Sequence, residues 1–356
     1  MHGAPLNVGD YELLAEAALD EGSFGYFAGG AGDEHTVRQN REAFDRWRLR
    51  PRTLVDVSSV STATTVLGHD VTMPILTAPV AYQRMAHPDG EAAVARAAAA
   101  VGTIMCLSTF STTGLAAVAE AAPDAQRWFQ LYWHPDRGVT RTVLDQAREA
   151  GFSAVVFTVD VPVLGRRERD LRTGFTLNPG YRIEAYGSAL GELGTQPAAL
   201  AAELIDSTLS WRDLEWLYDA AGVPVLAKGI LTAEDAVLAA DHGCAGVVVS
   251  NHGGRQLDRS VASLDALPEV VEAVGDRVEV LMDSGIRRGT EAAIALALGA
   301  RAVLVGRPVI WGLAADGEDG VRHVLELLRD ELAQALALLG CPTPGDLGRE
   351  HVVRAS

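Results

Sequence analysis

The chain has 356 residues, of which 48% are hydrophobic, and its formal net charge is −17. So acidic a chain disfavours nucleic acid and anionic membrane as partners, because both reward clustered Lys and Arg, although local arginines can still bind a small anion. The three cysteines, Cys106, Cys244 and Cys341, are far apart and have no metal-ligand spacing, so we expect a reducing cytoplasm, no disulfides and no metal. The N-terminus shows no signal peptide pattern.

Residues 7–50 are expected to form a helical extension in which Asp10 is the N-cap of the first helix. From residue 73 onward, a short apolar run, a polar or glycine-rich stop and a helical pattern recur eight times. The predicted strands span residues 73–80, 103–109, 127–133, 154–162, 224–230, 246–253, 278–285 and 302–308. Strands that are apolar throughout are typical of a parallel sheet buried on both faces. Eight near-regular units favour a closed α/β fold, a (β/α)8 TIM barrel over residues 73–340 within one domain (1–356), rather than an open doubly wound sheet.

Two segments depart from this regular pattern. Residues 97–119 carry no charge over a membrane-spanning length, but Gly102 and the polar residues 108–114 divide them into helix end, strand, turn and new helix. We therefore expect them in the core of the barrel. About sixty residues separate the fourth predicted strand from the fifth, far more than an ordinary connection. The insertion at residues 175–210 is either a lid over the active face or an insertion without a role.

Groups able to bind polar ligands follow every predicted strand, and TIM barrels place their catalytic groups at these strand ends. After the seventh and eighth strands, the segments DSGIRRG (283–289) and VGRP (305–308) combine glycines with Arg287 and Arg307. Barrels commonly bind phosphate at this place, where backbone N–H groups and guanidinium groups meet an anion. The two segments together predict a phosphorylated ligand.

The segment SNHGGRQLD (250–258) places His252 and Arg255 after the sixth strand. Arg255 and Arg167 can both bind a carboxylate, and Asp160 can accept a hydrogen bond from the imidazole and stabilise its cation. Lys228 ends the fifth strand and has two possible roles. It either forms a Schiff base with a carbonyl group or stays protonated and stabilises negative charge on a cofactor.

At SNHGGRQLD the chain resembles the FMN-dependent α-hydroxy acid oxidase and dehydrogenase family, which includes glycolate oxidase, lactate oxidase, mandelate dehydrogenase and hydroxymandelate oxidase. The resemblance covers nearly the whole chain. It rests on YFAGGAGDE, NREAF, LRPR, PILTAPVA, AHPDGE, FQLYW, TVDVPVLGRRERD, LAKGI, SNHGGRQLD, DSGIRRG and ALGARAVLVGRPV, in this order. It implies oxidation of a small L-2-hydroxy acid (lactate, glycolate or mandelate type) to the 2-oxo acid with bound FMN, and a homotetramer by analogy.

The resemblance also implies roles for single residues. His252 is the base that takes a proton from the substrate, Asp160 is its carboxylate partner, and Tyr132 contacts the substrate hydroxyl. The substrate carboxylate is bound by Tyr26, Arg167 and Arg255. The flavin ring is contacted by Pro79, Val80, Ala81, Ser108, Gln130, Thr158, Lys228 and Ser250, and here Lys228 is the charged residue rather than a Schiff base. Asp283 holds the ribityl chain, and Ser284, Gly285, Arg287, Gly306 and Arg307 lie at the phosphate.

Three positions refine this interpretation. Ser284 replaces a glycine that many relatives carry, yet FMN binding is expected to be kept. Phe110 stands where many relatives have Trp or Tyr, which favours an apolar substrate side chain. Ala81 resembles the oxidases, and no cytochrome domain is evident, so O2 is the expected acceptor and H2O2 the product. The alternatives are a dehydrogenase that passes electrons to a quinone or another carrier, a flavin-dependent isomerase and a non-catalytic flavin-binding protein.

Overall fold

A computed structural model describes residues 4–178, 180–189 and 195–355 of the chain. Eight parallel strands form a closed barrel in the order β10-β11-β4-β5-β6-β7-β8-β9, which confirms the predicted TIM barrel. Each strand lies within its predicted range. The strands are β4 (Ile75–Thr77), β5 (Met105–Ser108), β6 (Arg127–Leu131), β7 (Ala154–Thr158), β8 (Val225–Ile230), β9 (Gly246–Val249), β10 (Glu279–Asp283) and β11 (Ala302–Val305).

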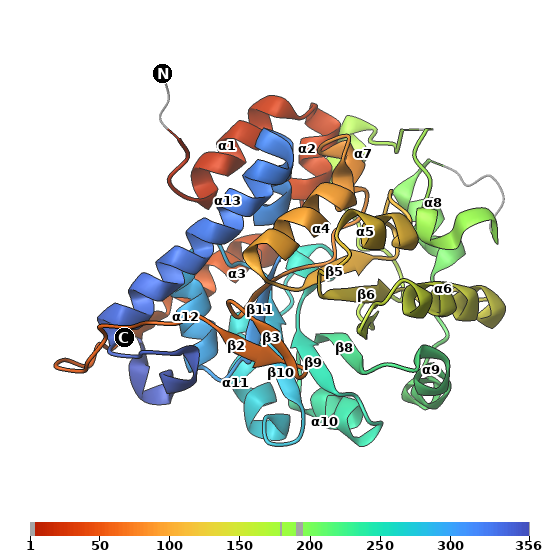
Figure 1. The fold of residues 1–356 in the computed structure, drawn as a ribbon. Coiled ribbons are helices and arrows are strands. Elements are labelled where there is room, and N and C mark those ends of the chain that lie inside the picture. Colours follow the sequence, from red (N-terminus) through yellow and green to blue (C-terminus); the bar gives the residue numbers. More distant parts are fainter. Residues whose placement is uncertain (1–3, 179, 190–194, 356) are drawn as a thin grey trace.

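One helix of the outer ring follows each strand of the barrel (Figure 1). The ring comprises α4 (Gly90–Val101), α5 (Leu115–Ala121), α6 (Arg137–Glu149), α9 (Leu214–Ala221), α10 (Ala233–Asp241), α11 (Ser263–Val274), α12 (Gly289–Ala297) and α13 (Arg307–Leu339). Alternate strand residues such as Leu76, Trp128 and Leu281 fill the barrel interior, and the residues between them pack against the helices. The strands are buried on both faces, as their continuous apolar sequence predicts.

A hairpin closes the amino end of the barrel. Its strands β2 (Thr64–Val66) and β3 (His69–Val71) contribute Val66 and Val71 to the interior cluster. The backbone N–H of Leu67 in its turn donates to Glu279, the first residue of β10, over 2.9 Å. The hairpin does not cover the carboxyl end of the barrel, which is formed by the loops that follow the strands.

The uncharged stretch at residues 97–119 belongs to the core, as predicted. Helix α4 ends at Gly102, whose φ of 71° lies in the left-handed region that glycine tolerates, and β5 and α5 follow. The described part of the chain contains no helix that is both long and apolar enough to span a bilayer.

The N-terminal extension is helical, as expected, and comprises α1 (Val8–Ala18), α2 (Glu21–Ala28) and α3 (His35–Asp45). The prediction that Asp10 is the first N-cap was wrong. Asn7 has the extended backbone of a cap, and its side chain accepts the N–H of Asp10, which lies in the first turn. Strand β1 (Trp47–Leu49) then pairs antiparallel with β12 (Val352–Arg354) near the C-terminus.

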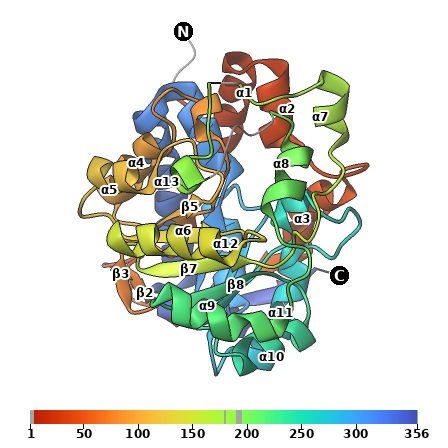
Figure 2. The same cartoon turned by 90° about the vertical axis from the view of Figure 1, so that its right-hand side faces the viewer.

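The insertion predicted at residues 175–210 falls partly outside the described residues, at 179 and 190–194. Its described part, with the residues just before and after it, contains α7 (Glu168–Thr173), η2 (Glu184–Ala189), α8 (Pro197–Leu204) and η3 (Trp211–Asp213). Both views place α7 and α8 at the end of the molecule where α2 lies (Figures 1 and 2). The insertion and the N-terminal extension therefore meet at the same end of the barrel.

Candidate active site

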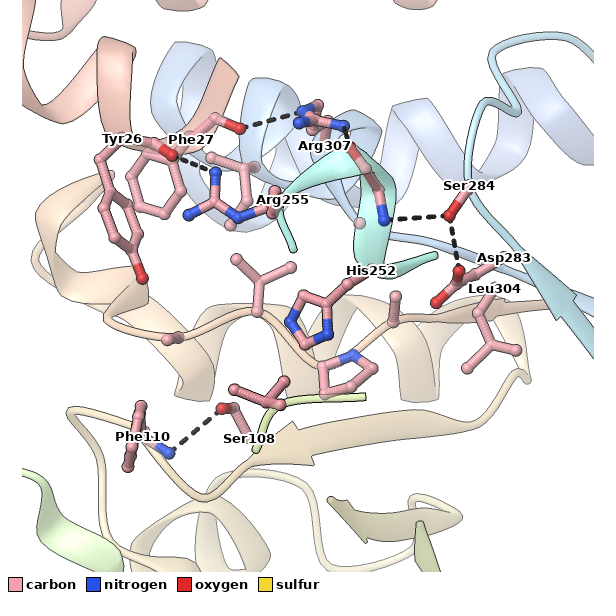
Figure 3. A pocket seen from close by; sticks show the side chains of 18 of the residues that line it. Tyr26, Phe27, Ser108, Phe110, His252, Arg255, Asp283, Ser284, Leu304 and Arg307 are labelled. Carbon is pink, nitrogen blue, oxygen red and sulfur yellow. Dashed lines mark hydrogen bonds between the residues drawn. The ribbon is translucent and has the colours of Figure 1, made fainter. Parts of the chain in front are cut away.

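A cavity lies at the carboxyl ends of the barrel strands. It contains roughly 1090 Å³ of space free of protein atoms, open solvent at its mouth included. The predicted site residues that line it are Tyr26, Pro79, Val80, Ala81, Ser108, Phe110, Tyr132, Arg167, Lys228, His252, Arg255, Asp283, Ser284, Gly285, Arg287, Gly306 and Arg307. Figure 3 shows His252 between the pair Tyr26 and Arg255 on one side and the pair Asp283 and Ser284 on the other.

Four predicted site residues lie behind this lining rather than on it. Gln130 accepts a hydrogen bond from the Ser108 hydroxyl over 3.2 Å and donates one to Thr158 over 3.0 Å. Ser250 accepts from the Lys228 ammonium over 2.9 Å. The fourth, Asp160, contacts His252. Each of them thus supports the wall of the cavity, and direct contact of Gln130, Thr158 and Ser250 with a cofactor remains a prediction.

His252 begins the short turn η4 (His252–Gly254) directly after β9. Its φ is 59°, and Gly253 and Gly254 follow with φ of 67° and 75°, so three consecutive residues adopt the left-handed conformation. Its Nδ1 lies 3.0 Å from Asp160 Oδ1, and its Nε2 lies 3.4 Å from the Tyr132 hydroxyl. Because a carboxylate accepts at Nδ1, that nitrogen carries the proton and the lone pair is on Nε2, beside Tyr132 on the cavity wall.

The protonation states of His252 and Asp160 allow His252 to act as a base. Burial lowers the pKa of His252 below 6.5, and this effect outweighs the attraction of Asp160 for the imidazolium. Burial by itself raises the pKa of Asp160, but His252 and Lys228 outweigh it, and the pKa is below its ordinary value. At neutral pH the imidazole of His252 is therefore neutral and is held by the carboxylate of Asp160. The imidazole is able to accept a proton, and the carboxylate then stabilises the resulting cation.

Lys228 is buried and ionised. Its Nζ lies 3.0 Å from Asp283 Oδ2, and its side chain is 4% exposed. Burial by itself lowers the pKa of Lys228, but Asp283 and Asp160 outweigh it, and the pKa is raised. A Schiff base requires a neutral amine, so this environment favours the charge-stabilising role.

Two arginines lie near the Tyr26 ring. The Arg255 guanidinium carbon is 4.8 Å from the ring centroid, and that of Arg167 is 5.8 Å away. Burial, and then the neighbouring Arg167, lower the pKa of Arg255 to about 10. In the described ranges no carboxylate oxygen lies within 4.0 Å of either guanidinium. The two cations next to His252 are therefore suited to bind a carboxylate supplied by a ligand.

A second pair of cations, Arg287 and Arg307, follows β10 and β11. Arg307 donates to the carbonyl group of Phe27 over 3.0 Å (Figure 3). It also donates to the carbonyl groups of Gly253 and Gly29 over 3.0 and 2.8 Å. Burial lowers the pKa of Arg287 to about 10 and that of Arg307 to about 9. In the described part of the chain no carboxylate oxygen lies within 4.0 Å of either guanidinium group. A phosphate would supply the missing negative charge, so these residues fit the phosphate group of FMN.

Aromatic and aliphatic side chains form the remaining wall. The rings of Tyr82 and Phe110 stack with centroids 6.0 Å apart. The centroids of the Phe110 and Tyr132 rings lie 5.0 Å apart. The wall also contains residues that the sequence analysis did not single out, namely Val161, Leu164, Pro197, Ala201 and Ile205. The last three recur every four residues from the start of α8, and this helical spacing was the signal available in the sequence.

Comparisons with known proteins agree with this geometry. The family model described as FMN-dependent dehydrogenase matches residues 15–354. The chain is 49% identical to an L-lactate oxidase of Nostoc sp. (strain PCC 7120), covering 97% of both chains, and 48% identical to glycolate oxidase 5 of Oryza sativa subsp. japonica, covering 99% of this chain and 96% of that protein. A crystal structure of mandelate oxidase superposes with a TM-score of 0.92 at 41% identity, covering 99% of both chains.

The family match spans nearly the whole chain, and the relatives align with it from end to end. The same chain folds into the closed barrel whose cavity contains the paired His252 and Asp160 and the two pairs of arginines. The chain belongs to the FMN-dependent dehydrogenase family.

Proposed function

We propose that this protein oxidises small L-2-hydroxy acids to 2-oxo acids, with FMN as its cofactor and O2 as the electron acceptor, giving H2O2. The observation that carries the proposal is the position of His252 in one cavity with Tyr132, the Arg167 and Arg255 pair and the ionised Lys228. The similarity to L-lactate oxidase, glycolate oxidase and mandelate oxidase supports the same reaction class.

The residues of the chain divide the work of this reaction. Arg167, Arg255 and Tyr26 bind the substrate carboxylate and so orient the α-carbon. Tyr132 contacts the substrate hydroxyl, and His252 Nε2 accepts a proton from the substrate while Asp160 stabilises the imidazolium. Bound FMN would supply the acceptor for the two electrons of the oxidation, which O2 would take up in turn.

The cofactor would be held by residues at the ends of all eight barrel strands and in the loops that follow them. The ring would contact Pro79, Val80, Ala81, Ser108, Gln130, Thr158, Lys228 and Ser250. Asp283 would hold the ribityl chain, and Ser284, Gly285, Arg287, Gly306 and Arg307 would surround the phosphate. The positive charge of Lys228 is suited to stabilise negative charge on the reduced ring.

The walls of the cavity favour an apolar substrate side chain. Tyr82, Phe110, Val161 and Leu164 offer a hydrocarbon surface near the imidazole. Helix α8 adds Pro197 and Ala201, and the residue that follows it adds Ile205, which supports the lid role of the insertion at 175–210. A mandelate-like acid would bury its ring against this wall.

The test is turnover by the purified FMN-loaded protein in air with L-lactate, glycolate and L-mandelate. We expect one 2-oxo acid and one H2O2 for each hydroxy acid consumed. If a quinone analogue reoxidises the reduced protein and O2 does not, the acceptor is wrong and the protein is a dehydrogenase. If no acid of a broad 2-hydroxy acid panel is oxidised under either condition, the substrate class is wrong.

We also propose a cytoplasmic homo-oligomer, a tetramer by analogy with the family. All three cysteines are free thiols buried in the fold, which suits a reducing compartment. Light scattering of the eluted holoenzyme measures the number of subunits, and a monomer at micromolar concentration would contradict the proposed assembly.

A further inference from the structure

Three polar side chains of SNHGGRQLD have no part in the proposed chemistry. Asn251, Gln256 and Asp258 surround His252 and Arg255 in sequence, but none of them lines the cavity. Each of them makes hydrogen bonds to a segment far away in the chain. These contacts suggest what the three side chains do.

Asn251 pairs with Asn40 of helix α3. The Asn40 amide donates to Asn251 Oδ1 over 2.8 Å, and the Asn251 amide donates back to Asn40 Oδ1 over 2.7 Å. The two side chains are 3% and 4% exposed. Asn251 Oδ1 also accepts the backbone N–H of Gly254 over 3.1 Å, so the pair fixes the turn that contains His252.

Asp258 caps the same helix from a distance of more than 200 residues along the chain. Its Oδ1 accepts the N–H of Thr36 over 2.9 Å, and its Oδ2 accepts that of Asp33 over 3.0 Å. The residue at the N-cap position of α3, Glu34, makes no side-chain cap hydrogen bond. Asp258 therefore supplies the oxygen that an N-cap residue ordinarily supplies.

Backbone contacts close the remaining distance between α3 and the His252 turn. The N–H of Ala31 donates to the Gly254 carbonyl over 2.9 Å. A Cβ on Gly254 would lie 2.7 Å from the Val37 nitrogen, so only glycine allows this approach. The helix thus packs directly on the turn that holds the imidazole.

Gln256 joins the turn to the loop after β7. Its amide nitrogen donates to the carbonyl groups of Asp160 and Val163 over 3.1 and 2.9 Å. Its amide oxygen accepts the N–H of Gly165 over 3.2 Å. The loop that carries Asp160 is thereby fixed to the turn that carries His252.

We infer that Asn40, Asn251, Gln256 and Asp258 are positioning residues, which together hold the His252 turn between helix α3 and the β7 loop in the geometry that proton removal requires. The N-terminal extension then contributes to the active site, because its helix α3 fixes the position of the His252 turn. Misplacing a reacting group by about 1 Å can lower a rate by roughly 100-fold, so loss of these contacts should be visible in kinetics. The kinetic consequence rests on the proposed function, and the structural one does not.

The test compares Asp258→Ala, Asn40→Ala and Gln256→Ala with Asn7→Ala as holoenzymes saturated with FMN. Asn7→Ala removes an N-cap of the same kind from α1, a helix of the same extension, and serves as the matched control. The first readout is the rate of anaerobic flavin reduction by the best substrate. The second is hydrogen–deuterium exchange of residues 250–258, which requires no activity.

We expect flavin reduction to slow by roughly 10- to 100-fold in the three positioning variants and to stay unchanged in Asn7→Ala, which lowers only the thermal stability. Asp258→Asn keeps one oxygen for the helix and should restore much of the rate. Exchange in residues 250–258 should rise in the three variants and not in the control.

Exchange that matches the control in every variant would overturn the inference, as would unchanged reduction rates at full FMN occupancy. Should no 2-hydroxy acid reduce the wild-type flavin, the proposed function fails while the exchange comparison still decides the positioning role. Asp258 is only half-buried, so its variant keeps the comparison informative even if Asn40→Ala does not fold.

Discussion

Two regions of the cavity differ in whether their charged side chains have an oppositely charged partner in the protein. In the first, the paired-charge region, Lys228 lies 3.0 Å from Asp283 and His252 lies 3.0 Å from Asp160. In the second, the arginine region, the guanidiniums of Arg167, Arg255, Arg287 and Arg307 have no carboxylate within 4.0 Å in the described part of the chain. The same barrel end thus contains charges that are neutralised by the protein and charges that are left for a ligand.

The presence or absence of an internal charge partner distinguishes side chains suited to catalysis from side chains suited to ligand binding. An internal partner fixes the protonation state and the orientation of Lys228 and His252 before any substrate arrives. A buried cation without an internal partner lowers stability until an anion binds, so it favours the bound state. We therefore propose that the paired-charge region serves catalysis, and that the arginine region binds the substrate carboxylate and the cofactor phosphate.

The largest expected effect comes from removing the base. In His252→Gln the substrate still meets both arginines, but no imidazole accepts its proton. We expect turnover to fall by roughly 10²- to 10⁴-fold with little change in FMN binding, measured by steady-state kinetics and flavin titration. Turnover close to the wild-type value would assign the base elsewhere.

The second prediction contrasts the two regions in the FMN-free protein. Asp283→Asn leaves Lys228 buried without its partner and should lower the free energy of unfolding by about 3–5 kcal/mol. Arg287→Met removes a guanidinium that has no carboxylate partner, so the free energy of unfolding of the FMN-free protein should stay the same or rise. Its FMN dissociation constant should instead rise by roughly 10- to 150-fold, the equivalent of about 1.5–3 kcal/mol.

Denaturant unfolding and flavin titration measure these two quantities in both variants. If Asp283→Asn and Arg287→Met lowered the free energy of unfolding of the FMN-free protein equally, the distinction between paired and unpaired charges would be wrong. An Arg287→Met variant that binds FMN as tightly as the wild type would contradict it too.

The third prediction concerns pH. In the proposed mechanism His252 acts in its neutral form, and burial holds its pKa below 6.5. The value of kcat/KM should therefore be constant at neutral pH and fall only when the pH drops through that lowered pKa. Asp160→Asn removes the carboxylate that favours the imidazolium and should move this acid limb to still lower pH while reducing the maximal rate. A pH profile that moves to higher pH in Asp160→Asn would contradict the assignment.

The smallest effect is expected at the aromatic wall. Phe110→Ala removes a ring that stacks on Tyr82 and opens the side of the cavity. The ratio of kcat/KM for L-mandelate to that for glycolate should fall by roughly tenfold, which lies in the range for lost contacts in a hydrophobic pocket. An unchanged ratio would place the substrate side chain elsewhere in the cavity.

The sequence predicted the fold and most of the cavity lining because both depend on local patterns. Each strand is an apolar run with a stop, and the stop places residues such as Lys228 and His252 at the carboxyl end of the barrel. Strand ends do not show which side chain faces the cavity. Gln130 and Ser250 lie just behind the lining, where they hydrogen-bond Ser108 and Lys228, and their contact with a cofactor stays a prediction. The pairing of Asp258 with Thr36 joins residues 222 positions apart, and no local pattern reports such a contact.

The most direct test of the account is anaerobic mixing of the FMN-loaded protein with each enantiomer of lactate and mandelate, followed by the visible flavin absorbance. We predict rapid bleaching with an L-acid in the wild type, slow or no bleaching with the D-acids, and a large loss of the fast phase in His252→Gln. A flavin that stays oxidised with every acid, or that His252→Gln reduces as fast as the wild type, would contradict the claim that this cavity removes a proton and two electrons from a 2-hydroxy acid.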